Sequence, residues 1–223
     1  MKTAILIGAT GVTGRPLARY LLNSDSYSKL IVFSRRALDL DNPKLINHVV
    51  DFDCPDEWCD KIQGDDLFSC MGTTRKQAGS KEGQYTVDFT YQANTIKTAA
   101  SNGVKRLFLV SSPGANKNSS MFYPKIKGEL DAFALKQPFD CHVLFKPSLI
   151  VGDRADKRAG EKIATALITP LCRWIPGLSG YRPILGEELA KAIAHCAETL
   201  NDGGAHTIKL GDIFNYLPNY LPE

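Results

Sequence analysis

A short apolar run that leads directly into three regularly spaced glycines constrains the fold of this 223-residue chain more than any other feature. Residues 4–7 read Ala-Ile-Leu-Ile, and Gly8, Gly11 and Gly14 follow. In such a pattern the first glycine permits a tight turn, the second lets phosphates approach the backbone, and the third lets a helix pack on the strand. The unpaired N–H groups at the start of that helix attract anions. The pattern therefore predicts a strand, a phosphate-binding turn and a helix.

The sequence after the glycines fits this prediction. Residues 15–22 carry apolar side chains at helical spacing, with Pro16 in the first turn, where its missing N–H has no consequence. A second apolar run at 30–33 completes a strand-helix-strand unit. Glycines at this spacing also occur in ordinary turns, which is the alternative interpretation. The flanking strands and helix favour a dinucleotide site.

Strand and helix patterns alternate along most of the chain. The other predicted strands are 47–50, 66–70, 106–110 and 141–145, and the predicted helices are 14–23, 55–62, 81–102 and 121–136. This alternation predicts an α/β fold, a Rossmann-like doubly wound parallel sheet with helices on both faces. Ligands of such sheets bind beyond the carboxyl ends of the strands.

The pattern changes after residue 150. Residues 161–174 and 187–200 are predicted helices, and prolines and glycines interrupt 176–183. We expect a single nucleotide-binding domain over residues 1–223, in which 152–185 contribute a small C-terminal substrate lobe.

Composition excludes several classes of function. The formal charge of +3 is spread along the chain without a block of like charges, so we expect no nucleic-acid binding. No apolar stretch is long enough to span a bilayer. The six cysteines form no Cys-x-x-Cys pair and no signal peptide is recognisable, which predicts reduced, mostly buried thiols in a soluble cytoplasmic protein. The four histidines are not at metal-ligand spacing, so we expect no metal.

Two arginines follow the second predicted strand. Arg35 and Arg36 lie about twenty residues beyond the glycines, where an NAD enzyme places a carboxylate on the ribose hydroxyls. Guanidinium groups can bind the 2′-phosphate of NADP, which a carboxylate would repel. A solvated arginine pair at a strand end is the alternative. Together with the glycine turn, the pair favours NADP(H) as the cofactor, with NAD(H) as the second possibility.

Two other predicted strand ends face the same ligand. At Cys70-Met71-Gly72-Thr73 the glycine allows backbone to lie against the cofactor, and the threonine hydroxyl can meet ribose or phosphate. Asp51 and Phe52, just past the third strand, are expected to contact the edge and the face of the adenine. Asp51 is equally suited to capping the helix that follows.

A tyrosine and a lysine suggest chemistry at the nicotinamide end. Tyr123 and Lys127 are separated by one helical turn and follow a strand that ends in Ser111-Ser112. A tyrosine acts as an acid or base near neutral pH only if its phenol pKa falls from about 10. A nearby ammonium and an oxidised nicotinamide ring both favour the phenolate. The same pair arises by chance in many helices, so its position after the serine-ending strand carries the prediction.

These residues resemble the short-chain dehydrogenase/reductase superfamily, through the glycine turn, Ser112, Tyr123 and Lys127. Residues 70–75, 127–129 and 152–158 are similar to an atypical subgroup of it, the Tat-interacting oxidoreductase family. The resemblance implies that Tyr123 protonates a carbonyl oxygen, that Lys127 holds the nicotinamide ribose and lowers the tyrosine pKa, and that Ser112 bonds the carbonyl. The cofactor contacts that it implies are Thr10, Gly11, Val12, Thr13, Arg35, Arg36, Met71, Gly72, Pro147, Ile150 and Arg158.

The chain departs from the family at two points. Asp88 stands where many extended members have an asparagine, and Ser111 is the alternative to Ser112, since the strand end is predicted only to within a residue.

The sequence thus predicts an NADP(H)-dependent oxidoreductase that acts on a small carbonyl or alcohol substrate. A non-catalytic NADP(H) sensor that reports to a protein partner is the alternative. A nucleotide-sugar epimerase or dehydratase is a third, against which the two arginines and the short C-terminal region count. A monomer and a homodimer are both compatible with the sequence.

Overall fold

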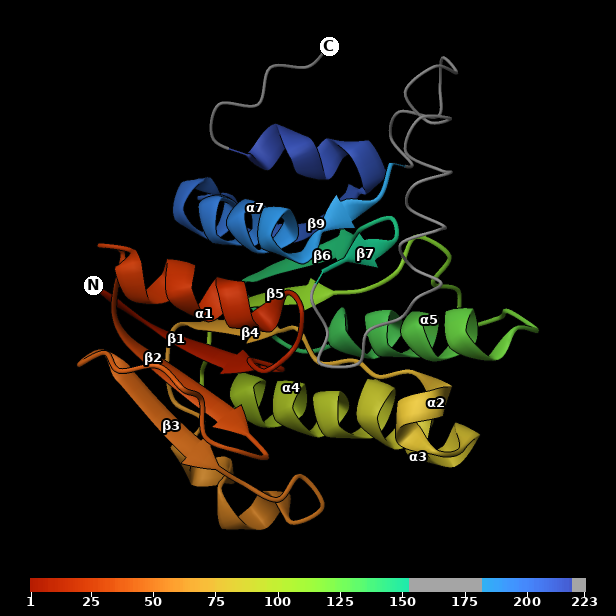
Figure 1. The fold of residues 1–223 in the computed structure, drawn as a ribbon, viewed down its shortest axis with the longest axis horizontal. Coiled ribbons are helices and arrows are strands. Elements are labelled where there is room, and N and C mark those ends of the chain that lie inside the picture. The colour runs from red at the N-terminus through yellow and green to blue at the C-terminus, as the bar shows by residue number, and fades with distance from the viewer. Residues whose placement is uncertain (153–181, 218–223) are drawn as a thin grey trace.

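The computed structural model describes residues 1–152 and 182–217. Its main sheet has seven parallel strands in the order β3-β2-β1-β4-β5-β6-β9 (Figure 1). The strands are β1 (Lys2–Ile7), β2 (Tyr27–Ser34), β3 (Leu45–Val49), β4 (Asp66–Ser69), β5 (Arg106–Val110), β6 (Cys141–Lys146) and β9 (Gly204–Lys209). The predicted Rossmann-like α/β class is confirmed.

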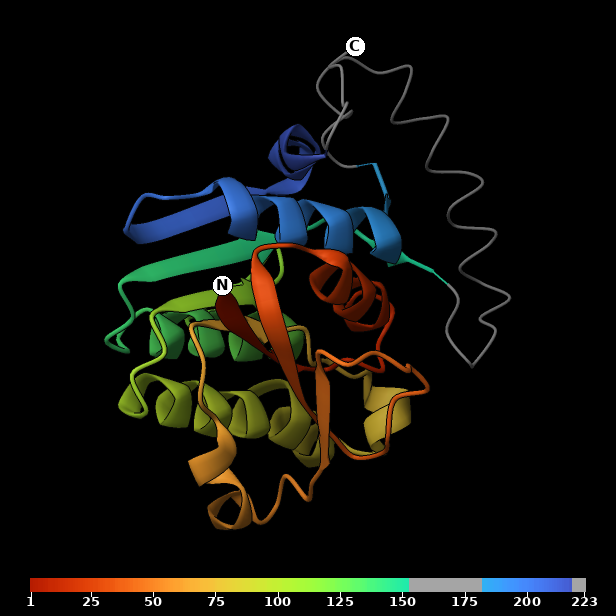
Figure 2. The same ribbon diagram turned by 90° about the vertical axis from the view of Figure 1, so that its left-hand side faces the viewer.

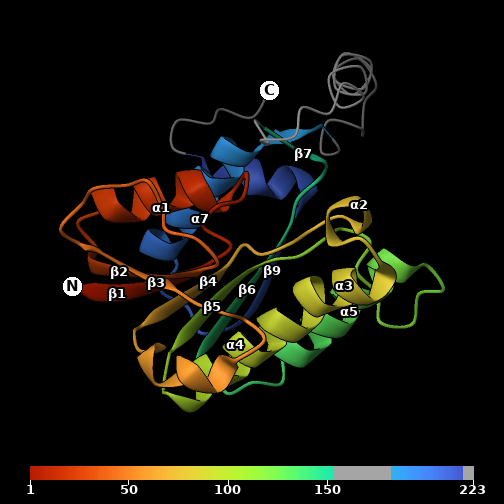
Figure 3. The ribbon, with the colours of Figure 1, turned by 60° about the horizontal axis from the view of Figure 1, so that its bottom comes forward.

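Helices cover both faces of the sheet. One face carries α1 (Gly14–Asn23) and α7 (Gly186–Thr199), and the other carries α4 (Tyr91–Ser101) and α5 (Phe122–Ala134) (Figures 1 and 3). Figure 2 shows the same layers from the side, with the red α1 and blue α7 on one side of the strands and the green α4 and α5 on the other. Within 1–152 and 182–217, no helix is both long and apolar enough to cross a membrane.

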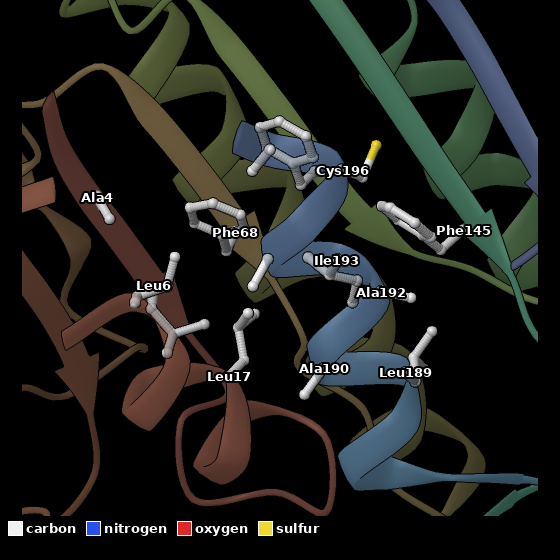
Figure 4. Packing of buried hydrophobic residues seen from close by; sticks show 14 of the residues in the cluster. Ala4, Leu6, Leu17, Phe68, Phe145, Leu189, Ala190, Ala192, Ile193 and Cys196 are labelled. Carbon is white, nitrogen blue, oxygen red and sulfur yellow. The ribbon is translucent and has the colours of Figure 1, made fainter. Parts of the chain in front are cut away.

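The sheet separates two hydrophobic cores because successive strand residues point to opposite faces. Leu6 of β1 packs in the core beneath α1 and α7, whereas its neighbour Ile7 packs in the core beneath α4 and α5. Figure 4 shows Ile193 of α7 in the first core, with Phe68 and Phe145 of the sheet nearby. Five of the six predicted strands are such buried apolar runs, which explains why they were recognisable.

Hydrogen bonds join α1 to α7 near both ends of the pair. The Tyr20 hydroxyl donates to Glu187 Oε1 at 2.7 Å, and Ser24 Oγ donates to Glu198 Oε1 at 2.5 Å. Burial and the Glu187 carboxylate raise the pKa of Tyr20 to about 12. The two helices are therefore fixed side by side, and the start of α7 lies close to the start of α1.

One predicted helix needs correction, and several short elements were not predicted. The predicted helix at 55–62 is a pair of 3-10 turns, Pro55–Glu57 and Cys59–Lys61. The buried Trp58 side chain between them donates from Nε1 to the Asp51 carbonyl at 2.8 Å, and this bond holds the segment against the strand end. Several other elements were not predicted from the sequence. They are β9, the 3-10 helix Leu210–Tyr216, the short helix α2 (Arg75–Ala78), and the paired strands β7 (Ile150–Val151) and β8 (Ile184–Leu185). The predicted helix at 161–174 and most of the predicted lobe at 152–185 lie outside the described residues.

Candidate cofactor and active site

The glycine turn lies where the direction of strand order reverses. The chain moves from β1 to β2 on one side and later returns to β4 on the other side of β1. Gly8 follows β1 with φ +80°, and a Cβ on it would lie 2.4 Å from the carbonyl carbon of Cys70 at the end of β4. Both the backbone conformation and the close approach require glycine. Sheets of this kind bind ligands at this reversal.

The turn folds tightly onto itself before α1 begins. The Gly11 N–H donates to the Gly8 carbonyl at 3.0 Å, and a Cβ on Gly14 would lie 2.1 Å from that same oxygen. The turn and packing roles predicted for Gly8 and Gly14 are therefore confirmed. Thr13 is buried, while Thr10 and Gly11 are exposed at the rim, next to the N–H groups that open α1.

Val12 lies between the turn and the C-terminal part of the chain. A Cβ on Gly152 would lie 2.5 Å from Val12 Cγ1, and one on Gly186 would lie 2.3 Å from the same atom. The turn thus packs against the start of α7 as well as against the end of β4. No local sequence pattern reveals this contact, because it joins residues that are more than a hundred positions apart.

The two arginines lie beside the turn. Arg35 and Arg36 directly follow β2, and both are exposed. Together with Thr10 they line a pocket of about 300 Å³. The two predicted phosphate-binding segments are therefore close together in space.

The predicted adenine contacts need one correction. The Phe52 side chain is only 4% exposed, and its ring packs against Trp58 and Tyr91, with centroids 5.2 and 5.4 Å away. It has no open face for an adenine, so the predicted stacking of the Phe52 ring is corrected to a role in the core. Asp51 is exposed, and its Oδ1 accepts the Asp53 N–H at 2.9 Å. Asp51 therefore caps a turn, and not the helix that was predicted to follow it.

The segment that leaves β4 passes over a buried carboxylate. Met71 and Thr73 are half-buried and Gly72 is exposed. The Thr73 N–H donates to Asp88 Oδ1 at 3.2 Å, and a Cβ on Gly72 would lie 3.3 Å from that oxygen. Asp88 thereby holds the backbone that is expected to line the cofactor.

Asp88 belongs to an irregular turn within a long helical segment. The predicted helix at 81–102 is observed as α3 (Lys81–Tyr85), a π-helical segment (Thr86–Thr90) and α4. Such π-helical turns are frequent at functional sites. Asp88 is 1% exposed, and Oδ2 has no hydrogen-bond partner among the residues described. Burial raises the pKa of Asp88, and the Lys127 ammonium and the Thr73 N–H oppose that shift.

Lys127 is buried inside α5, facing the end of β5. It is 3% exposed, and its Nζ donates to the Val110 carbonyl at 2.9 Å. Burial lowers the pKa of Lys127, and the carboxylates of Asp88 and Asp131 oppose that shift. Asp131 in turn pairs with Lys146 Nζ at 2.7 Å. Two buried acidic side chains therefore counteract the effect of burial on the Lys127 ammonium.

The other predicted catalytic residues lie on α5 and just after β5, the two elements that Lys127 connects. Tyr123 lies one turn earlier on α5 and is 42% exposed. Ser112 is half-buried, whereas Ser111 is 5% exposed and its Oγ has no hydrogen-bond partner in the described part of the chain. The Ser111 N–H donates to the Phe145 carbonyl at 2.8 Å, which ties this end of β5 to β6.

The remaining predicted contacts follow β6. Pro147 is buried just after that strand, and Ile150 is half-buried in β7. Arg158 lies outside the described residues. All the other predicted site residues follow the carboxyl ends of the parallel strands or lie at the start of α1 or α5, so the topology gathers them at one edge of the sheet.

Known proteins resemble this chain in sequence. A family model described as NAD(P)H-binding matches residues 8–137. Protein HTATIP2 of Rattus norvegicus is 36% identical over 167 residues, which are 73% of this chain and 69% of that protein. Protein FMP52, mitochondrial, of Candida glabrata is 32% identical over 199 residues, which are 86% of this chain and 83% of that protein.

Solved structures share the fold at low sequence identity. MoeE5 in complex with UDP-glucose and NAD has a TM-score of 0.68 at 13% identity, covering 96% of this chain and 80% of its own. The oxidoreductase ylbE from Lactococcus lactis has a TM-score of 0.56 at 19% identity, covering 69% of this chain and 72% of its own. Likenesses at this identity support the architecture alone.

The relatives correct one prediction and establish another. The predicted cytoplasmic location is contradicted, because several relatives carry the word mitochondrial in their names. Reduced thiols and a small net charge are compatible with either compartment, so composition could not distinguish them. The glycine turn, the sheet topology and the matched sequences agree on one conclusion. This chain belongs to the NAD(P)H-binding family, with a Rossmann-like fold of the short-chain dehydrogenase/reductase type.

Proposed function

We propose that this protein is an NADPH-dependent reductase of small carbonyl compounds, which also catalyses the reverse oxidation of the alcohol. The observation that carries the proposal is the gathering of two features at one edge of the sheet. One is the phosphate pocket formed by Thr10, Arg35 and Arg36, and the other is Tyr123 on α5, one turn from the buried Lys127.

The described residues fit a nicotinamide dinucleotide phosphate. The glycine turn leaves backbone exposed at the start of α1, where pyrophosphate oxygens would meet N–H groups. Arg35 and Arg36 would bind the 2′-phosphate by charge-assisted hydrogen bonds. Asp51 would contact the adenine edge. The backbone at 71–73 would lie along the ribose, and Pro147 and Ile150 would lie at the nicotinamide end.

When bound, NADPH would supply the hydride that reduces the carbonyl carbon in the proposed reaction. Tyr123 donates its phenol proton to the carbonyl oxygen, and takes it back in the reverse direction. Ser112 donates a hydrogen bond to the same oxygen, and we favour it over Ser111 because Ser112 is the more exposed of the two. The Lys127 ammonium stabilises the phenolate that remains on Tyr123.

The substrate lobe remains part of this proposal. We infer that residues 1–223 act as one domain and that 152–185 contribute to binding the carbonyl compound. A nucleotide-sugar epimerase is not favoured, because the arginine pair suits NADP, whereas the two MoeE5 structures that hold UDP-sugars carry NAD in their titles.

Turnover by a tyrosine variant tests the reductase proposal. Purified protein is given NADPH and a panel of aldehydes and ketones, and the loss of NADPH absorbance is followed. Tyr123→Phe is expected to lower kcat by about a hundredfold or more, the usual contribution of a general acid. Its Kd for NADPH is expected to stay unchanged. Equal turnover by variant and parent would overturn the assignment.

The same assay separates the alternative function. NADPH binding without turnover on any carbonyl compound, combined with NADPH-dependent capture of a protein partner, would favour a redox sensor over a reductase. Mass spectrometry of the dinucleotide that copurifies tests the cofactor separately, with NADP expected and NAD counting against the role of the arginines.

A further inference from the structure

We propose that Asn47 on β3 is the positioning residue that makes this site select NADPH over NADH. It does so by holding the turn that carries Arg35 and Arg36. This inference rests on the proposed NADPH-dependent function. Asn47 lies beside Val32 in the parallel pairing of β2 and β3, and its side chain reaches the segment that follows β2.

The side-chain amide of Asn47 bonds to both ends of residues 34–38, which we call the arginine turn. Its Oδ1 accepts the Leu38 N–H at 2.7 Å, and its Nδ2 donates to Ser34 Oγ at 3.0 Å. A backbone N–H can only donate, so the amide oxygen must face Leu38 and the amide nitrogen must face Ser34. Arg35 and Arg36 lie between these two anchored residues.

Ser34 extends the restraint to the arginines themselves. Its side chain is buried, and Oγ donates to the Arg36 carbonyl at 2.7 Å. Because Oγ also accepts from Asn47, the three residues form a continuous chain of hydrogen bonds. Leu38, at the far end of the turn, packs against the hydrophobic core. The backbone of the turn is thus fixed from within, while both guanidinium side chains remain exposed.

Fixing this turn affects one cofactor and not the other. NADPH differs from NADH only in the 2′-phosphate, and the two arginines are the described residues that we assign to it. A relaxed turn would let the guanidinium groups move out of register with the phosphate oxygens, and charge-assisted bonds depend on that geometry. The Asn47 side chain bonds to Val32, Ser34 and Leu38, none of which belongs to the glycine turn or to the exit of β4, so contacts common to both cofactors would remain.

The selectivity of an alanine variant tests this role. The full chain is titrated with NADPH and with NADH, and binding is followed by nicotinamide fluorescence. Asn47→Ala is expected to raise the Kd for NADPH about tenfold, equivalent to losing one charge-assisted bond, and the Kd for NADH less than about twofold. Ser34→Ala is expected to shift the same ratio in the same direction. A merely structural role would leave the ratio of the two constants unchanged.

Asn42→Ala is the matched control. Asn42 Oδ1 accepts the Lys44 N–H at 2.9 Å in the same connection between β2 and β3, outside the arginine turn. Both dissociation constants should therefore stay at their parent values in this variant.

Four results would overturn the inference. One is a folded Asn47→Ala protein with unchanged NADPH affinity, and another is an equal loss of affinity for both cofactors. If Asn47→Ala does not fold, an unchanged ratio of the NADPH and NADH dissociation constants in Ser34→Ala would also overturn the inference. A parent protein that binds NADPH and NADH equally would overturn the NADPH proposal as well, whereas the first two results leave that proposal standing.

Discussion

At the scale of single residues, the site depends on charges that the fold has removed from water. Lys127 is 3% exposed and Asp88 is 1% exposed, so neither is solvated as a free ion would be. An ammonium in such a place keeps its charge only when acidic neighbours offset desolvation. The charge of Asp88 does this for Lys127, and Asp88 Oδ1 accepts the Thr73 N–H. One carboxylate therefore acts on both the buried lysine and the backbone that follows β4.

Removing this charge should shift the pH dependence of the proposed reaction. Burial already lowers the pKa of Lys127 and Asp88 opposes that shift, so Asp88→Asn is expected to lower the Lys127 pKa further. The alkaline limb of the profile of kcat/KM for carbonyl reduction should therefore move to lower pH. Glu129→Gln is the control, because Glu129 lies on the same helix but pairs with Lys125 at 4.0 Å. An unchanged profile in Asp88→Asn would contradict this role.

At the scale of elements, the ends of β1 and β4 touch through Gly8. Gly79 shares the left-handed backbone of Gly8, but a Cβ on Gly79 would have no atom of the described residues within 4 Å. A comparison of substitutions at Gly8 and Gly79 therefore separates the effect of backbone strain from the effect of steric contact.

Alanine at these two glycines should have different effects. Gly8→Ala places a methyl group 2.4 Å from the Cys70 carbonyl carbon, so it is expected to lower the free energy of unfolding by about 1–3 kcal/mol more than Gly79→Ala does. Urea denaturation of both variants measures the difference. Equal effects would mean that the close approach between the strand ends is unimportant.

The burial pattern of each element explains which elements the sequence could predict. β4 and β5 are short buried apolar runs and α1 has a clear apolar face, so their patterns were sufficient. β9 has only Ile208 buried, and its other side chains give no apolar alternation. The Tyr123 and Lys127 spacing is local and was recognisable for the same reason as α1. The Asn47 hydrogen bonds and the contact of Val12 with Gly186 join distant segments, so no local pattern could reveal them.

At the scale of the whole molecule, one buried ion pair connects the sheet to the C-terminal helix. Arg106 donates from Nε and Nη2 to the Asp66 carboxylate at 2.6 and 2.5 Å. It also donates to the carbonyls of Leu200 and Ala197 at the end of α7. The Tyr27 hydroxyl completes the cluster by donating to Asp66 at 2.6 Å, and burial together with this carboxylate raises the pKa of Tyr27. The first residues of β4 and β5 are thereby bonded to the end of α7, which comes late in the chain.

Breaking this ion pair should destabilise the fold strongly. Arg106→Met leaves the buried Asp66 carboxylate with only the Tyr27 hydroxyl and the half-exposed Lys2 ammonium, 3.9 Å away, as partners. Removing the main partner of a buried charge reduces the free energy of unfolding by about 3–5 kcal/mol. Lys105→Met is the neighbouring control, because its pair with Asp140 is exposed on both sides, and it should change stability by less than about 0.5 kcal/mol. Chemical denaturation gives both values, and similar losses in the two variants would contradict the prediction.

The packing of Val12 between Gly152 and Gly186 also bears on how a ligand is received. The phosphate turn is supported on one side by the end of β4 and on the other by the start of α7. A loop held in this way is preorganised, so binding a pyrophosphate need not remove much conformational entropy from it. The affinity of the N-terminal turn is in this sense partly determined by residues near the other end of the protein.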